Sequence, residues 1–144
     1  MRRKLIVAAS LVTLAAATTA FDRQNPEEAA VRAALNHYLL GHSTGDGAHH
    51  RAVFHPESKL FFNRDGRFST RTSEEYIAGS PGKPAADEAQ RKRRIVSVDV
   101  TGDAAMAKVE LDYPNVFFTD YFNLLKVDGK WMIVNKTFNA KQKK

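Results

Sequence analysis

The sequence predicts a single α+β domain in which helices come first and an antiparallel sheet follows. Three observations support this prediction. A capped apolar helix pattern begins at Asn25, Asp-Gly pairs separate short apolar strands, and the chain contains no cysteine. Asp-Gly pairs favour two-residue hairpin loops, and 144 residues are enough for one core. Without disulfides, that core must supply the stability.

Residues 1–20 have the three-part pattern of a secretory signal peptide. A basic start precedes an apolar run that ends at Ala17, and small residues follow up to Ala20. We expect cleavage after Ala20, with cleavage after Ala17 as the alternative. The run is shorter than the roughly 20 residues of a membrane span. We therefore expect a periplasmic or secreted protein without stable membrane insertion after cleavage, and an uncleaved anchor is the alternative.

The distribution of charge argues against a nucleic acid partner. The formal net charge is +6, but three of the basic residues, Arg2, Arg3 and Lys4, lie in the leader. The other basic clusters are short and lie at residues 91–94 and in a tail at residues 141–144. Such a balance is not a nucleic acid-binding signature. We expect no cofactor either, because neither a Gly-rich phosphate loop nor a nucleophile elbow occurs in the sequence.

The expected domain covers residues 21–140, and its first half contains three helices and a hairpin. Asn25 is a good N-cap for the first helix, and Asp46 begins a second, short helix that ends near Val53. A hairpin follows, with Asp65-Gly66 at its turn. The pattern Thr72-x-x-Glu75 is a capping box and predicts the third helix.

The second half of the domain reads as an antiparallel meander. Its first hairpin turns at Gly102-Asp103, between the alternating runs "RIVSVDV" and "AMAKVELDY". Alternation of apolar and polar residues predicts one buried and one solvated face. The expected buried face pairs Val100 with Ala105, Val98 with Ala107 and Val96 with Val109.

The closing hairpin, "FTDYFNLLKVDGKWMIVNKTF", carries polar residues within apolar strands. With Asp128-Gly129 as the loop, regular pairing places Tyr121 opposite Lys136 and Asn123 opposite Val134. Both faces of this hairpin are mainly apolar, so we expect a homodimer that covers the outer sheet face. The expected pocket face carries Tyr121, Asn123 and Lys136, and the opposite face carries Asp120, Asn135 and Thr137.

The order of elements resembles the nuclear transport factor 2-like (NTF2-like, cystatin-like) superfamily over residues 26–138. The segments that carry the resemblance are "YLLGHSTGD", "FHPESKLFF", "VDVTGDAAMAKVEL" and the closing hairpin. The last of these is similar to the secreted bacterial "putative lumazine-binding" and SnoaL-like branch. The resemblance implies a cone in which a curved antiparallel sheet wraps around N-terminal helices, with a ligand pocket between them.

One member of this superfamily, ketosteroid isomerase, offers a further comparison. Its helical tyrosine precedes a Gly-Asp pair with the spacing that Tyr38 has to Gly45-Asp46 here. The resemblance therefore implies that Tyr38 is a hydrogen-bond donor in the pocket. The place of the isomerase's carboxylate base is filled by Leu60, Phe61 and Phe62, so that reaction is not implied.

Four histidines lie close together in the sequence, but their spacing does not fit a metal site. No pair among them has the i, i+4 spacing of helical zinc ligands, and we expect no bound metal. Surface or capping roles are expected for His42, His49 and His50. His55 lies at a helix–strand junction, where an imidazole serves either as a general base or as a tie to the backbone.

Lys136 is the most informative candidate residue, because burying an ammonium without a partner is costly. If its face is covered, the ammonium needs Tyr121, Asn123 or an anionic ligand as acceptor. The alternative is that its stem packs while its head reaches water.

The sequence thus favours a small-molecule-binding module with ligand contacts from Tyr38, His55, Tyr121, Asn123 and Lys136. The alternative is an acid–base enzyme of the isomerase, dehydratase or cyclase type acting on a small hydrophobic or anionic substrate. In that enzyme, His55 or Asp120 is the base and Tyr38 the donor. A third hypothesis is a structural protein that fills its cavity with side chains and uses its outer sheet face.

Overall fold

The computed structural model describes residues 25–144, and the expected signal peptide lies outside them. Helices and strands follow in the predicted order, and a 3₁₀ turn (Glu88–Gln90) precedes the meander. The helices are α1 (Pro26–Thr44), α2 (Gly47–Arg51) and α3 (Ser73–Ala78). The strands are β1 (Phe54–Arg64), β2 (Arg67–Thr72), β3 (Lys92–Thr101), β4 (Ala104–Asp112), β5 (Val116–Val127) and β6 (Lys130–Gln142).

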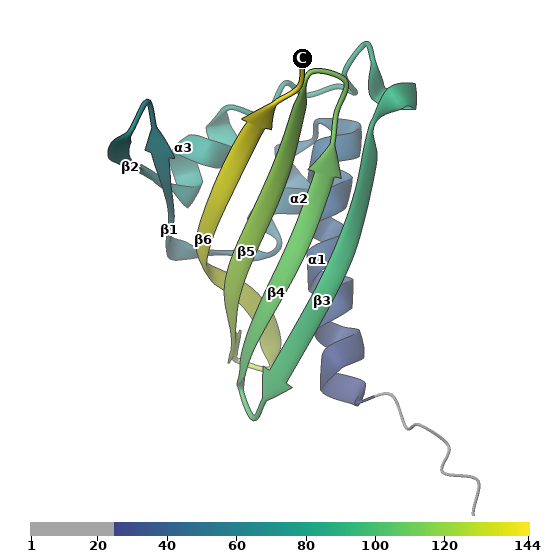
Figure 1. Ribbon diagram of the computed structural model, residues 1–144. Helices are drawn as coiled ribbons and strands as arrows, with labels where there is room; N and C mark the ends of the chain where they lie inside the picture. Colours follow the sequence, from purple (N-terminus) through teal and green to yellow (C-terminus); the bar gives the residue numbers. More distant parts are fainter. Residues whose placement is uncertain (1–24) are drawn as a thin grey trace, which may run out of the picture.

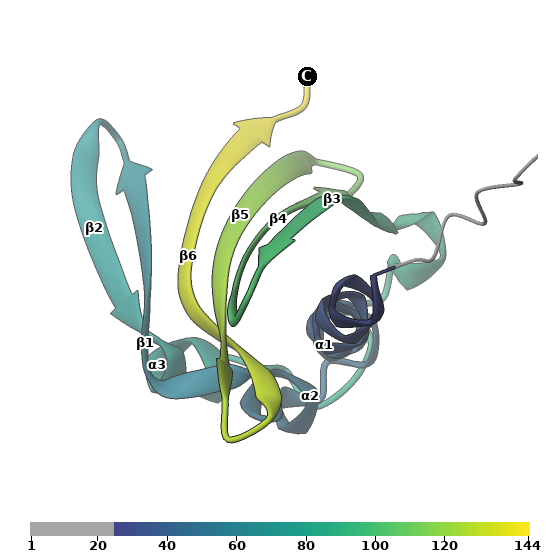
Figure 2. The same cartoon turned by 90° about the horizontal axis from the view of Figure 1, so that it is seen from below.

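The strands form one six-stranded sheet in the order β2-β1-β6-β5-β4-β3. All neighbours are antiparallel except β1 and β6, which run parallel. Figure 1 shows α1 behind the long strands β3 to β6. In the end-on view of Figure 2, the sheet curves around α1, and the β1–β2 hairpin stands apart at the far edge. This arrangement is the curved cone that the resemblance implied.

Local sequence signals set the ends of the helices. The Asn25 side chain accepts a hydrogen bond from the backbone N–H of Glu27 and caps α1. Asp46 caps α2 in the same way. Thr72 and Glu75 form the expected capping box at the start of α3. Each cap satisfies backbone N–H groups that have no partner within the helix.

The core lies between α1 and the inner face of the sheet. Val31, Leu35 and Tyr38 of α1 are fully buried, because their spacing places them on one side of the helix. They meet alternate residues of the strands, such as Val109 and Phe122. Among residues 25–144, no helix combines the length and the hydropathy of a transmembrane segment.

A β-bulge in β6 changes the predicted register of the closing hairpin. The Asp128-Gly129 loop forms as expected, and Leu124 pairs with Ile133. Beyond that point, Asn123 pairs with Asn135, so that Val134 is the extra residue of the bulge. The predicted pairing of Tyr121 with Lys136 is therefore wrong. Tyr121 pairs with Thr137, Phe122 with Lys136 and Asp120 with Phe138.

A second bulge, in β3, changes the predicted pairing of the β3–β4 hairpin. Val100 pairs with Ala105 and Val98 with Ala107, as predicted. Val96 is then the extra residue, and Ile95 instead pairs with Val109. Bulges increase the local twist and bend of a strand. Both bulges thus contribute to the curvature that makes the inner face concave.

Candidate functional site

A cavity of about 560 Å³ opens between the inner face of the sheet, the end of α1 and α3. Its walls combine apolar and polar side chains, with Leu60, Phe118 and Phe138 among the apolar ones. The charged groups that line it are Lys136, Arg64, Arg71 and Asp65. This balance favours a ligand with a negative or strongly hydrogen-bond-accepting group, and the volume suits a small organic molecule.

Lys136 is held by a buried polar cluster that consists of Tyr38, Asp120 and Lys136. The Lys136 ammonium donates to the Tyr38 hydroxyl at 2.6 Å, and its nitrogen lies 3.0 Å from Asp120 Oδ2. The Tyr38 hydroxyl donates to the same Asp120 oxygen at 2.6 Å. Asp120 is 0% exposed and Lys136 only 4%. Of the three, only Lys136 also lines the cavity, so Asp120 and Tyr38 lie behind it.

Aromatic rings surround the Lys136 ammonium. Its nitrogen lies 4.9 Å from the ring centre of Tyr38, 5.0 Å from that of Phe138 and 5.3 Å from that of Tyr76. Ring faces attract a cation, and burial among them also removes water from the ammonium. Desolvation lowers the pKa of Lys136 below its ordinary value, although Asp120 opposes the shift. Burial, followed by the charge of Asp120, raises the pKa of Tyr38 well above its usual range.

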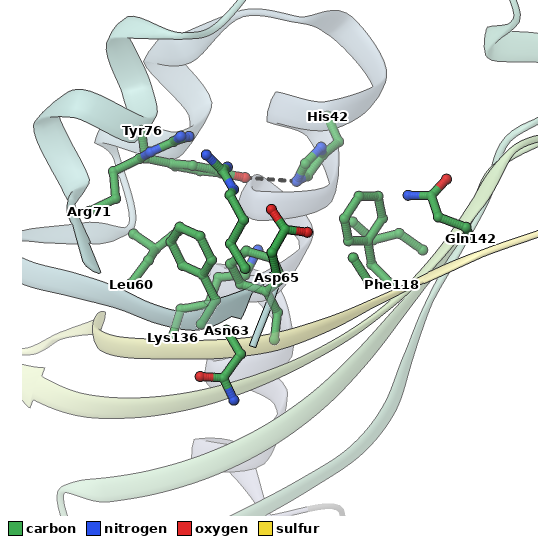
Figure 3. Close-up of a pocket in the computed structure, with 14 residues that line it drawn as sticks. His42, Leu60, Asn63, Asp65, Arg71, Tyr76, Phe118, Lys136 and Gln142 are labelled. Carbon is green, nitrogen blue, oxygen red and sulfur yellow. Dashed lines mark hydrogen bonds between the residues drawn. The ribbon is translucent and has the colours of Figure 1, made fainter. Parts of the chain in front are cut away.

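A second polar pair, His42 and Tyr76, lines the same cavity. The Tyr76 hydroxyl and His42 Nε2 are 2.9 Å apart (Figure 3). Burial, together with the nearby charge of Lys136, lowers the pKa of His42 well below its normal value. Burial also raises the pKa of Tyr76. Near neutral pH, the pair is therefore an uncharged imidazole beside a protonated phenol, in which the phenol can donate to the imidazole.

His50 supports this region from α2. Its Nε2 lies 3.1 Å from the Tyr38 carbonyl oxygen, an acceptor, so Nε2 carries the proton. Its Nδ1 has no hydrogen-bond partner among the described residues. Burial lowers the pKa of His50 to about 4. The ring also packs against Gly41, where any larger residue would collide with it.

The structure divides the predicted ligand contacts between two faces of the sheet. Lys136 and Tyr38 belong to the site, but Tyr121 and Asn123 are exposed on the outer face. Asp120 was expected on the other face of the hairpin from Lys136, but it contacts Lys136 on the inner face. His55 does not line the cavity: its Nδ1 accepts from the Glu57 backbone N–H. That contact is the backbone tie considered for this junction.

Sequence reasoning missed His42, His50, Tyr76 and Arg71. The expected surface and capping roles of His42 and His50 are wrong, because His50 is buried and His42 lines the cavity. His42 follows Tyr38 by four residues in α1, so the helical period places both on one face. That spacing was a usable signal. For Arg71 and Tyr76, no comparable signal exists, because their position depends on how β2 and α3 fold over β1.

The family comparison agrees with the fold and with the presence of a pocket. Residues 26–139 match the family described as "Putative lumazine-binding". A curated relative, "Aldolase FrzH" from a Cladobotryum species, is 25% identical over 103 residues, covering 72% of this chain and 82% of the relative.

Solved structures with a similar fold come from several bacteria. An NTF2-like protein of unknown function from Shewanella baltica is 28% identical, with a TM-score of 0.72 over 81% of this chain and 94% of its own. An NTF2-like protein of unknown function from Silicibacter pomeroyi is 26% identical, with a TM-score of 0.71 over 81% of this chain and 97% of its own. The chain therefore belongs to the putative lumazine-binding family of the NTF2-like superfamily.

Proposed function

We propose that this protein binds a small, partly apolar molecule through a carboxylate or carbonyl oxygen at the floor of the cavity. The observation that carries the proposal is the position of Lys136, a buried ammonium that is paired on one side and borders a cavity on the other. An oxygen of the ligand would accept a hydrogen bond from this ammonium while apolar walls cover the rest. The open cavity argues against the structural hypothesis, which required side chains to fill it.

In this proposal the protein acts outside the cytoplasm, and it binds its ligand either there or before both are exported. This part of the proposal is supported by the signal-peptide pattern of residues 1–20. N-terminal sequencing of the protein from its native host should find a chain that starts near Phe21. A soluble protein that retains Met1 would contradict the periplasmic or secreted location.

Calorimetry with a probe ligand tests the binding proposal. Mass spectrometry of the protein purified from its native host identifies the ligand that it carries there. Benzoate is a suitable probe, because it joins a carboxylate to an apolar ring. We expect Lys136→Met to weaken benzoate binding by roughly 2–5 kcal/mol, and Arg71→Leu to weaken it less. The matched control is Lys141→Met, which removes an exposed lysine of the same strand. Equal binding by all variants would contradict the proposal.

A second candidate function is an acid–base enzyme that acts on a carbonyl compound. It is favoured by the His42–Tyr76 pair on the cavity wall and by the likeness to a curated aldolase. If a bound ketone displaces the hydrogen bond between Tyr76 and His42, the freed imidazole nitrogen can accept the α-proton of the ketone and the phenol can donate to its oxygen. Exchange of the α-protons of cyclohexanone in D₂O, followed by NMR, should then require His42. Exchange that is unchanged in His42→Gln would exclude this role.

We also propose a homodimer through the outer face of the sheet. Met106, Tyr121 and Leu125 are 60%, 51% and 43% exposed there, and β4 and β5 bring them together. Contiguous exposed apolar residues often mark an interface. Light scattering should give twice the monomer mass, and Met106→Glu should shift it to the monomer. A monomeric wild type at micromolar concentration would refute this assembly.

A further inference from the structure

We propose that Lys136 captures an aldehyde or ketone covalently, as a protonated imine, in the cavity that it lines. This inference rests on the proposed function and deepens it by naming the class of ligand and the bond that forms. Its basis is the geometry of Lys136, whose nitrogen is fixed by Tyr38 and Asp120 while its side chain borders the cavity.

Burial of Lys136 makes its ammonium easier to deprotonate than that of an exposed lysine. The side chain is almost fully buried, and desolvation lowers its pKa. A buried lysine whose pKa is lowered by desolvation is a usual nucleophile of Schiff-base chemistry. Lysines on the outside of the described domain, such as Lys141, are exposed to water and lack this environment.

Asp120 provides a place for the proton that the ammonium must lose. Its Oδ2 accepts hydrogen bonds in the cluster, whereas its Oδ1 is buried without a hydrogen-bond partner in the described part of the chain. A buried carboxylate oxygen without a partner is costly, so taking up the proton of Lys136 offsets part of that cost. Asp120 is then a positioning and proton-holding residue behind the nucleophile.

The proposed step balances without any further reactant. After the ammonium has given one proton to Asp120, the lone pair of Lys136 Nζ attacks the carbonyl carbon. A C–N bond forms as the C=O π bond breaks, and the carbonyl oxygen takes up a proton from the nitrogen. The proton held by Asp120 returns as the C–O bond breaks, and the oxygen leaves as water. Overall, one ammonium and one carbonyl give one protonated imine and one water. The imine then acidifies the α-carbon of the bound compound, within the cavity that His42 also lines.

Reductive trapping with a matched pair of probes tests the proposal. Benzaldehyde and benzoate have nearly the same size, but only the aldehyde forms an imine. The wild-type protein is incubated with benzaldehyde and cyanoborohydride, digested, and mapped by peptide mass spectrometry. We expect benzylation at Lys136 to exceed that at exposed Lys141 by at least about tenfold, and an excess of benzoate to suppress it. Lys136→Met should lose this label only.

The outcomes separate this inference from the proposed function. Labelling of surface lysines alone, in a protein that binds benzoate through Lys136, overturns the covalent step and leaves the binding function standing. Labelling of Lys136 without benzoate binding supports the imine and contradicts the carboxylate site. Absence of both contradicts both. The peptide map uses the wild-type protein, so it decides the question even if Lys136→Met folds poorly.

Discussion

The inner and outer faces of β5 and β6 carry similar polar side chains in opposite environments. On the inner face, Asp120 and Lys136 are buried and paired. On the outer face, Tyr121 and Asn123 lie in water, and Asn123 donates a long hydrogen bond to Asn135. Neighbouring residues of one strand thus have different roles. Inner polar groups must satisfy one another or a ligand, whereas outer groups have water as a partner.

The bulge at Val134 decides which residues belong to which face. Without it, Lys136 would pair with Tyr121 and the buried cluster could not form, because Asp120 would lie on the other side of the strand. One extra residue therefore places the acid and the lysine of the closing hairpin on the same side. Treatments that act differently on the inner and the outer groups therefore test this difference between the two faces.

Acid should destabilise the protein first through its inner histidines and only later through its outer carboxylates. The unfolded chain binds a proton at His50 near pH 6.5, whereas burial lowers the folded-state pKa to about 4. The contribution of His50 is thus fully present above pH 6.5 and is lost as the pH falls toward 4. We expect this loss to reach roughly 3 kcal/mol. His42, whose pKa is also lowered by burial, acts in the same direction.

The outer carboxylates respond in a lower range. A hydrogen bond from Arg94 lowers the pKa of Glu110 below 4.5, so its contribution is present above that value and is lost below it. Urea unfolding between about pH 7 and pH 4.5 therefore isolates the histidines. His50→Gln should flatten the slope in this window. A wild-type profile that stays level until about pH 4.5 would show that the inner histidines are charged in the folded protein.

Removal of one tyrosine hydroxyl should lower the free energy of unfolding by a smaller amount. The loss should depend on which face of the sheet the hydroxyl lies on. Tyr38→Phe deletes a group that contacts both Asp120 and Lys136, and hydrogen bonds to charged groups contribute about 1.5–3 kcal/mol each. Because Asp120 and Lys136 keep their contact with each other, the net loss is smaller than the sum of the two bonds, and we expect about 2 kcal/mol in the free energy of unfolding. Tyr121→Phe is the matched control and should change stability by less than about 0.5 kcal/mol. Equal losses would mean that the two tyrosines have similar surroundings.

Much of the fold could be predicted from the sequence, because its signals are local. Asn25, Thr72 and the Asp-Gly pairs act on their own neighbours through caps and turns, and the structure has all of these features. The bulges at Val96 and Val134 have no such local signature. They arise where a sheet bends around α1, so they depend on tertiary packing.

The candidate site was predictable only in part for the same reason. Tyr38 and Lys136 were expected in it and contact each other. Asp120 was assigned to the opposite face, because regular pairing carries a single register through the whole strand. Tyr76 and Arg71 reach the cavity from α3 and β2. No local sequence pattern determines where these two elements lie relative to β6.

A double-mutant cycle between Asp120 and Lys136 measures whether the bulge at Val134 places these two residues in one buried pair. Asp120→Asn, Lys136→Met and the double variant are unfolded in urea at neutral pH. Each single change leaves a buried group without its partner, so the costs should not add. We predict a coupling energy of about 1–3 kcal/mol. A coupling energy below about 0.5 kcal/mol, with additive losses in the free energy of unfolding, would mean that the two side chains lie apart and would contradict the buried pair.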